Sequence, residues 1–279
     1  MEGRSNYHSH SLYCDGRAGM EDFVRFALSS GFTSYGFSSH APLPFPTAWT
    51  MEWDRMDDYL AEFRRLKEKY AGRIELYLGL EIDYLNEESH PAIERFRRLP
   101  LDYRIGSVHL LYDDEGRVVD ADLSAEKFRQ MVEKHFQGDV ERVVHLYYER
   151  SRRMVELGGF DIVGHADKVH YNAACCRPGI LDEPWYDRLV RDYFAEIARR
   201  GYQMEINTKA YEELGVFYPD VRYFPLLREL GVHVQVNSDA HYPERIASGM
   251  SEAFRALRRA GFTSVMQLQA GRWVEREIG

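Results

Sequence analysis

Two short motifs near opposite ends of the chain carry side chains that bind metal ions. The first is His8-Ser9-His10 and the second is Asp239-Ala240-His241. Residues two apart on a strand point to the same face, so both side chains of a pair can reach one ion. Taken alone, each motif is equally consistent with surface residues at a strand end or with a turn.

Further candidate ligands lie between these motifs, each after a short apolar run. Glu81 could bridge two ions or could remain a solvated carboxylate. His40, His109 and His165 could each instead be buried, hydrogen-bonded histidines. Six of the eleven histidines fall at predicted strand ends, and such nitrogen and oxygen ligands suit zinc, iron or manganese.

The elements that must position these ligands alternate between β and α. Strands are predicted at 7–10, 34–38, 74–80, 103–108, 161–163, 203–206 and 233–236. Helices are predicted at 19–30, 53–70, 91–98, 125–136, 140–157, 183–200, 222–230 and 252–260, with an apolar run at 262–268. This alternation favours an α/β fold with a parallel sheet and helical crossovers. In a parallel barrel the strand ends share one rim, where active sites are built.

Length and composition favour one soluble enzyme domain over residues 1–279. No apolar run approaches the roughly 18 residues of a membrane helix, and the first residues lack the apolar region of a secretion signal. The formal net charge of −9 disfavours general affinity for nucleic acid. Three cysteines, Cys14, Cys175 and Cys176, have no disulfide framework spacing, which is typical of the cytoplasm.

The remaining titratable candidates have competing interpretations. Asp15 is close enough to His10 to reach the same rim, although an ordinary Asp-Gly turn is the stronger interpretation. His170 follows His165 closely and could face a substrate. Four histidines are predicted to be structural or solvated: His90, His135, His145 and His233.

Together these motifs resemble the polymerase and histidinol phosphatase (PHP) superfamily, and within it the histidinol-phosphatase branch. The matching segments run in order along the chain: His8-Ser9-His10, Cys14-Asp15-Gly16-Arg17, Ser39-His40-Ala41-Pro42-Leu43-Pro44, Gly79-Leu80-Glu81-Ile82-Asp83-Tyr84, Ile105-Gly106-Ser107-Val108-His109, Gly164-His165-Ala166-Asp167 and Asn237-Ser238-Asp239-Ala240-His241. The resemblance implies a distorted seven-stranded (β/α) barrel with three divalent metal ions. The implied ligand sets are His8, His10, Glu81 and Asp239 for one ion, Glu81, His109 and His165 for a second, and Asp15, His40 and His241 for a third.

The resemblance also implies hydrolysis of a small phosphate monoester, L-histidinol phosphate in histidine biosynthesis, by a metal-bridging hydroxide. Asp239 or His241 would help to move a proton to the leaving alkoxide. Family members often bind phosphate through Arg residues after the Gly-His-x-Asp and Glu-x-Asn-Thr motifs, and this chain lacks them there. Lysine binds phosphate without the bidentate fork of Arg. The substitute candidates for phosphate binding are Arg17, Lys168, His170 and Lys209.

Alternative functions stay open at this point. Loss of the expected Arg residues is consistent with a PHP phosphoesterase acting on another small phosphate or on a nucleotide. A PHP nuclease is disfavoured by the acidic balance and the lack of basic runs. A non-enzymatic metal-binding module is also disfavoured, because so many ligands on one rim suit an open, reactive site.

Overall fold

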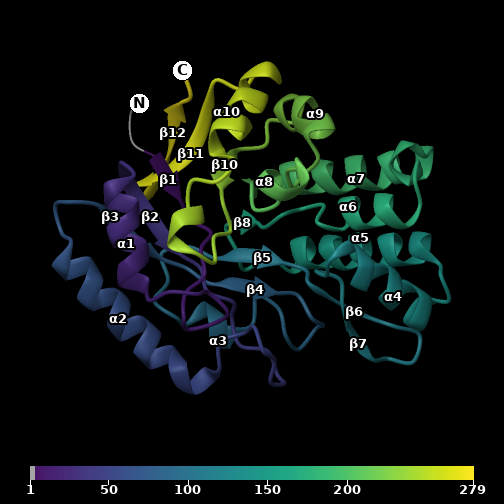
Figure 1. Ribbon diagram of the computed structural model, residues 1–279, viewed down its shortest axis with the longest axis horizontal. Helices are drawn as coiled ribbons and strands as arrows, with labels where there is room; N and C mark the ends of the chain where they lie inside the picture. The colour runs from purple at the N-terminus through teal and green to yellow at the C-terminus, as the bar shows by residue number, and fades with distance from the viewer. Residues whose placement is uncertain (1–3) are drawn as a thin grey trace.

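Parallel strands in two sheets form the centre of the molecule, which the computed structural model describes for residues 4–279 (Figure 1). The first sheet has the order β1-β2-β3, formed by Arg4–Asn6, Phe32–Phe37 and Glu75–Leu78. The second has the order β10-β9-β8-β5-β4, formed by Val234–Asn237, Gln203–Asn207, Ile162–Val163, Ile105–Ser107 and Glu81–Asp83. Every pairing within these two sheets is parallel. The predicted α/β class with parallel strands is therefore confirmed.

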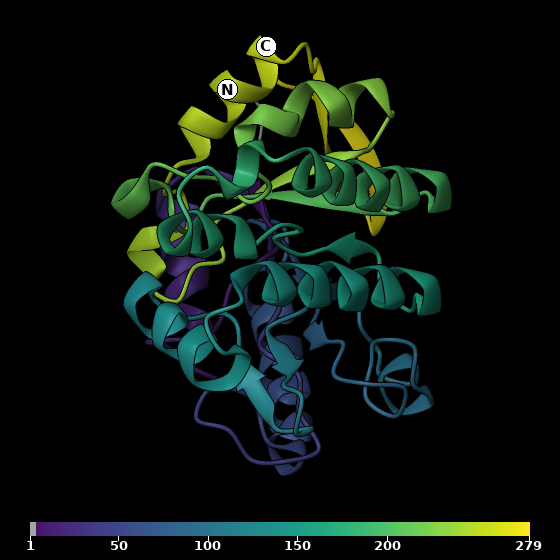
Figure 2. The same ribbon diagram turned by 90° about the vertical axis from the view of Figure 1, so that its right-hand side faces the viewer.

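Helices cover the outer faces of both sheets (Figures 1 and 2). The first sheet packs against α1 (Met20–Ser29) and α2 (Met56–Lys69). The second is flanked by α4 (Ala125–Phe136), α5 (Val140–Leu157), α6 (Val169–Cys176), α7 (Pro184–Arg200), α9 (Phe224–Glu229) and α10 (Met250–Arg259). The shorter helices are α3 (Glu94–Arg97) and α8 (Tyr211–Leu214), and 3-10 turns lie at Trp53–Arg55, Ile180–Asp182, Val221–Tyr223 and Pro243–Arg245. None of the described helices combines the length and apolar character needed to cross a membrane.

The predicted strand at 74–80 is interrupted. β3 ends at Leu78 in the first sheet, and β4 begins at Glu81 in the second. The break occurs at Gly79, where a Cβ atom would lie 2.5 Å from the ring of Tyr103. A larger residue would not fit beside this ring, so glycine is required at the break. The chain then enters the second sheet at Glu81.

Backbone pairing among the described residues does not close the predicted seven-stranded barrel. The first strand, predicted at 7–10, is also displaced, since β1 ends at Asn6. Side chains, in place of a ladder, link β1 to β10: the Tyr7 N–H donates to Asn237 Oδ1 at 2.8 Å, and the Ser238 N–H donates to Asn6 Oδ1 at 3.0 Å. Single backbone bridges also pair Ser9 with Ala240 and His40 with Glu81, so isolated bridges and side chains, and no continuous ladder among the described residues, join the two sheets.

Two hairpins and the helices α6 and α8 had no counterpart among the predicted helices and strands. An antiparallel hairpin joins β6 (Leu110–Tyr112) to β7 (Val118–Asp120), directly after the predicted ligand His109. A second hairpin joins β11 (Ser264–Gln269) to β12 (Arg272–Glu277). Helix α6 follows directly on the Gly164–Asp167 motif. Each is short and lacks a long periodic apolar pattern, which is the main sequence signal for an element.

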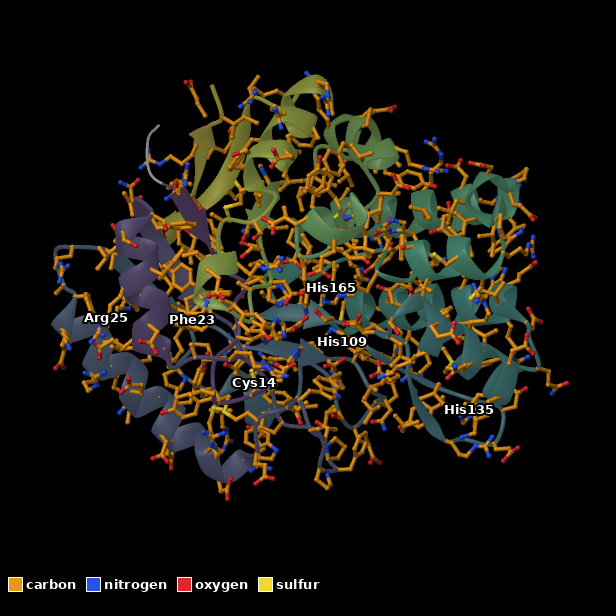
Figure 3. The ribbon with its side chains drawn as sticks, viewed as in Figure 1. Cys14, Phe23, Arg25, His109, His135 and His165 are labelled. Atoms are coloured by element: carbon orange, nitrogen blue, oxygen red, sulfur yellow. The ribbon has the colours of Figure 1, made fainter. Side chains whose placement is uncertain are left out.

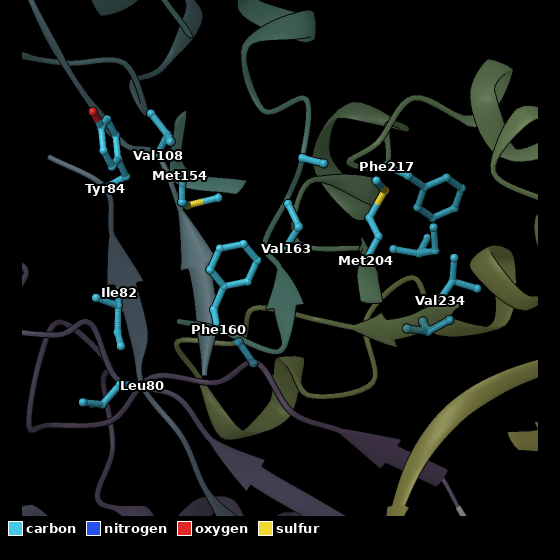
Figure 4. Packing of buried hydrophobic residues seen from close by; sticks show 14 of the residues in the cluster. Leu80, Ile82, Tyr84, Val108, Met154, Phe160, Val163, Met204, Phe217 and Val234 are labelled. Carbon is cyan, nitrogen blue, oxygen red and sulfur yellow. The ribbon is translucent and has the colours of Figure 1, made fainter. Parts of the chain in front are cut away.

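Apolar side chains from the strands and helices form the main core (Figure 4). Figure 4 shows Ile82 of β4, Val163 of β8, Met204 of β9 and Val234 of β10 within this cluster, and each is buried. Met154 of α5 packs into the same cluster. The second sheet, which carries Glu81 and leads to His109, His165 and Asp239, therefore rests on a continuous core.

Hydrogen-bonded tyrosines fill the interior between the sheets, on the side of the C-terminal hairpin. The Tyr103 hydroxyl shares its single proton between the carbonyl oxygens of Tyr7 at 2.6 Å and Phe37 at 2.9 Å. The Tyr7 hydroxyl accepts from the N–H of Leu268 in β11 at 2.8 Å. The hairpin also reaches the start of β3, where Glu75 accepts from the Ala270 N–H at 2.9 Å. This end of the molecule is thus closed by satisfied hydrogen bonds.

Candidate metal centre and active site

The carboxyl ends of the parallel strands bring the predicted metal ligands together. Ligand atoms lie within 4.8 Å of one another in several overlapping groups, namely His10, Asp15, His40 and His241; His8, His10 and Asp239; His40, Asp83 and His109; and Glu81, His109 and His165. Together these groups contain all nine predicted ligands and add Asp83. Scattered sequence positions therefore form one continuous cluster of nitrogen and oxygen atoms.

Glu81 lies at the centre of this cluster. Its Oε2 atom is 3.1 Å from His8 Nε2 and 3.0 Å from His40 Nδ1. Its Oε1 atom is 2.8 Å from His165 Nε2 and accepts from the Ser107 hydroxyl at 2.7 Å. Because its two oxygens face different histidines, this buried carboxylate is placed to bridge two cations.

Asp239 stands where β10 leaves the second sheet. Its Oδ1 atom lies 3.1 Å from His10 Nε2 and 3.8 Å from His8 Nε2. The Asp239 backbone has φ 48°, and His165 has φ 23°, so both residues are in the left-handed region that L side chains rarely adopt. Such strain persists where surrounding contacts enforce it and is common at functional sites.

A second part of the cluster lies nearer the surface. Asp15 Oδ2 is 3.3 Å from His241 Nε2, and Asp15 Oδ1 is 3.9 Å from His40 Nε2. The loop after β1 is held in place by the His10 N–H, which donates to the Ala240 carbonyl at 2.8 Å. Asp15 thus reaches the ligand cluster, although the Asp-Gly turn had been the stronger interpretation from sequence.

Two further buried carboxylates orient the histidines. Glu205 Oε2 lies 2.8 Å from His8 Nδ1, and Glu205 Oε1 accepts from the His165 backbone N–H at 2.7 Å. Asp83 Oδ1 lies 2.9 Å from His109 Nδ1. Sequence reasoning gave neither a role, although both stand in motif segments beside predicted site residues. A carboxylate behind a histidine fixes its tautomer and orientation toward a metal.

Several atoms of the cluster are buried without any hydrogen-bond partner. They are His8 Nε2, His10 Nε2, Asp15 Oδ1, His40 Nδ1, Glu81 Oε2 and His165 Nδ1. Buried polar groups left unpaired are costly. Ligands bound to one tetrahedral zinc ion lie roughly 3.4 Å apart, close to the separations around Glu81. The residues present therefore fit divalent metal ions.

The electrostatic surroundings favour the metal-binding forms of two central groups. Burial lowers the pKa of His10 well below its usual value, and the neighbouring His40 and His241 lower it further. Burial opposes ionisation of Glu81, but the surrounding histidines, first of all His8, hold its pKa well below the usual range. A neutral imidazole and an ionised carboxylate are the forms that bind cations.

A small cavity of about 180 Å³ opens beside the cluster. Its lining residues are Asp15, His40, Trp49, His109, Asp120, Asp122, Lys209 and His241. A larger cavity of about 570 Å³ lies on the α5 side near Arg150 and contains none of the predicted ligands. The smaller cavity is therefore the candidate active site.

The family of the chain follows from its sequence profile. The profile of the PHP domain matches residues 6–209. The chain belongs to the PHP domain family. The match ends before Asp239 and His241, which the fold nevertheless brings to the PHP metal cluster.

Relatives of similar length carry histidinol-phosphatase names. A Deinococcus radiodurans protein named "Probable histidinol-phosphatase" is 26% identical, and the alignment covers 95% of this chain and 96% of the relative. A Schizosaccharomyces pombe protein of the same name is 25% identical and is covered over 89% of its length, against 95% of this chain. Full-length alignment thus relates this PHP chain to one branch of the family.

Solved structures show the same fold. A Listeria monocytogenes protein described as a candidate histidinol phosphatase has a TM-score of 0.80 at 23% identity, covering 89% of this chain and 99% of its own. The Lactococcus lactis histidinol phosphate phosphatase, complexed with zinc, L-histidinol and phosphate, has a TM-score of 0.71 at 18% identity, covering 97% of this chain and 98% of its own. The PHP chain therefore shares their overall architecture.

The predicted phosphate-binding residues of this PHP domain differ in position. Lys209 lines the cavity, and its Nζ atom lies 3.2 Å from Asp239 Oδ1. Lys168 is buried, with Nζ 3.1 Å from Asp122 Oδ2 at the cavity wall. His170 is buried beside Asp167 and does not line the cavity, and neither does the exposed Arg17. The fold thus brings both lysines to the cavity or its wall.

The four histidines predicted to be structural or solvated lie outside the ligand groups. His135 pairs with Asp113 at 2.9 Å, and His145 stacks on Trp185 with ring centroids 4.9 Å apart. His90 accepts from the Ala92 N–H, and His233 is largely exposed. Figure 3 shows His109 and His165 close together at the centre, with His135 well away on the α4 side.

Proposed function

We propose that this PHP chain is a metal-dependent histidinol-phosphate phosphatase. The observation that carries the proposal is the Glu81-centred cluster of unpartnered buried nitrogen and oxygen atoms beside a small cavity that presents Lys209. The names of the full-length relatives support histidinol phosphate as the substrate. The whole chain, residues 1–279, acts as a single domain in this proposal.

Three divalent ions fit the ligand groups. His8, His10, Glu81 and Asp239 would hold one ion. Glu81, His109 and His165 would hold a second, and Asp15, His40 and His241 a third. When bound, such ions supply Lewis acidity and lower the pKa of a coordinated water toward neutrality. The nitrogen and oxygen ligands suit zinc, iron or manganese.

The protein's own residues position the phosphate ester and manage its proton. Lys209 projects a positive charge into the cavity, where it would bind the phosphoryl oxygens. Lys168, held by Asp122, adds positive charge from the wall. Asp239 or His241 would help to pass a proton to the leaving alkoxide, and of the two only His241 lines the cavity.

The closure of the barrel and the location of the protein belong to the same proposal. The side-chain bonds between Asn6, Asn237 and Ser238 would complete a distorted seven-stranded barrel in place of a ladder. The three cysteines are free, in keeping with a reducing, cytoplasmic location.

A substrate panel with metal analysis tests the function. We expect the purified, metal-loaded protein to hydrolyse L-histidinol phosphate with a kcat/KM well above that for p-nitrophenyl phosphate. Elemental analysis should find divalent metal in the active preparation. Equal rates on both esters would contradict the assignment.

A second candidate is a phosphatase for another small phosphate or a nucleotide. It is favoured by the lysines that stand in place of the family's phosphate-binding arginines. Nucleoside monophosphates in the same panel distinguish it, because a preference for them would replace histidinol phosphate as substrate. A cavity of about 180 Å³ is small for a polynucleotide, which disfavours the nuclease alternative.

A further inference from the structure

Three residues that are not candidate metal ligands form part of the cavity wall. Asp120 ends β7, and Asp122 follows it by two residues. Trp49 comes from the loop between β2 and α2. All three side chains line the same cavity as Lys209.

The two aspartates on this wall differ in their partners. Asp122 Oδ2 is occupied by Lys168 at 3.1 Å. Asp120 Oδ1 accepts only the Asp122 backbone N–H, at 2.7 Å. Among residues 4–279, no cationic side chain lies within ion-pair distance of Asp120. Asp120 is therefore a carboxylate in the cavity that no described Lys or Arg side chain pairs with.

The surroundings of Asp120 favour a positive charge. Burial raises the pKa of Asp120 to about 6, and the nearby Asp122 contributes to the same rise, while the Asp122 N–H and His109 oppose it in part. A cation placed beside this carboxylate would relieve both effects, because it stabilises the ionised form.

Trp49 supplies an aromatic surface beside these charges. Its ring stands edge-on to the rings of His40, with centroids 4.7 Å apart, and His109, with centroids 5.5 Å apart. These contacts fix the indole at the boundary between the ligand cluster and the cavity. Aromatic rings in such positions pack well against cationic or planar groups.

The cavity directly borders the metal-ligand cluster. His40 lines it, is only 6% exposed, and has an Nδ1 atom without a hydrogen-bond partner. The cavity thus combines histidines and Lys209, which suit phosphate, with Asp120 and Trp49, which suit a cationic, planar group.

We propose that Asp120 is a specificity-determining residue that binds the cationic, non-phosphate end of the substrate, with Trp49 packing beside it. The ligand class is a phosphate monoester of an amino alcohol. Histidinol phosphate belongs to this class, since it carries an ammonium group and an imidazole. The inference rests on the proposed function and extends it from the reacting phosphate to the leaving group.

Asp120→Asn tests the inference because it keeps the shape of the side chain and removes its charge. We expect kcat/KM for L-histidinol phosphate to fall roughly 10- to 100-fold, the range for a lost hydrogen bond to a charged group. The uncharged leaving group of p-nitrophenyl phosphate should be affected much less, so the ratio of the two kcat/KM values should collapse. The inhibition constant of L-histidinol should rise by a similar factor, while that of inorganic phosphate stays within about twofold.

Matched variants separate specificity from structure. Glu115→Gln removes one negative charge from the exposed turn of the same hairpin and should leave both substrates unchanged. Asp122→Asn should impair both substrates together, because Asp122 holds Lys168. Asp120→Glu should recover part of the lost selectivity by restoring the charge.

The outcomes also separate this inference from the proposed function. A wild-type protein with no preference for histidinol phosphate overturns the proposed function and the inference with it. A wild-type preference that survives in Asp120→Asn overturns only the role of Asp120. Equal loss on both substrates with reduced metal content would make Asp120 a structural residue and would likewise overturn the inference.

Discussion

The two ends of the sheets differ in whether their buried polar groups have hydrogen-bond partners. On the hairpin side, the Tyr103 and Tyr7 hydroxyls find carbonyl and N–H partners, and Trp273 packs edge-on against Tyr7 at 5.3 Å. At the carboxyl ends, Glu81 and the histidines around it keep buried atoms without partners. Satisfied polar groups give stability, whereas unsatisfied ones raise the energy of the ligand-free protein. The hairpin side therefore stabilises the fold, and the carboxyl ends of the strands are arranged to bind ligands.

The largest effect on activity is expected from removing the His8 imidazole at the ligand-binding end. We expect His8→Ala to lower kcat/KM by more than about 100-fold, because even partners behind a metal ligand cost 10- to 100-fold. Elemental analysis should show reduced metal content, while circular dichroism shows the native fold. His233→Ala is the matched control, since it removes an exposed imidazole outside the cluster. Full metal content in His8→Ala would contradict the ligand assignment.

A smaller effect, a loss of metal affinity, is expected from changing Glu205, which contacts the ligands His8 and His165. Glu205→Gln leaves the shape but replaces an oxygen that faces His8 or the His165 N–H. We expect metal affinity to fall by roughly 10- to 100-fold, measured by competition with a chelator. Glu213→Gln, in an exposed helix, should leave affinity unchanged. If Glu205→Gln binds metal normally, the buried carboxylate has a purely structural role.

Lys209 tests the substrate side of the ligand end. Lys209→Ala should raise KM for the phosphate ester by about tenfold, the lower part of the range for a charged hydrogen bond, because the lysine is partly exposed. Metal content should stay close to that of the wild type. Steady-state kinetics at saturating metal measures the change, with the exposed Lys127→Ala as control. An unchanged KM would remove Lys209 from the phosphate site.

The smallest effect on activity should come from the hairpin side, where stability changes instead. Tyr103→Phe removes a buried donor that two carbonyl oxygens share, and should lower the free energy of unfolding by about 2 kcal/mol. Tm should fall by roughly 4–8 °C, while kcat/KM stays within about twofold. Tyr242→Phe, at an exposed tyrosine, serves as the control for thermal unfolding. Loss of activity without loss of stability would show that the two ends are not separable in this way.

The alternation of strands and helices, and the presence of candidate ligands at the strand ends, could be predicted from the sequence. Local patterns carry this information, because apolar periodicity and short motifs such as His8-Ser9-His10 and Asp239-Ala240-His241 depend only on near neighbours. The sequence also indicated that Glu81 could bridge cations, because a carboxylate has two oxygens to share.

Which of these groups come into contact, and which residues orient them, depends on the tertiary structure. The break at Gly79 depends on the distant Tyr103 ring, and Glu205 acts through His8, which lies 197 positions away in the chain. Asp120 enters the cavity because a hairpin with no clear sequence signal turns it there. Contacts of this kind are set by packing between elements, and packing depends on residues that no local window contains.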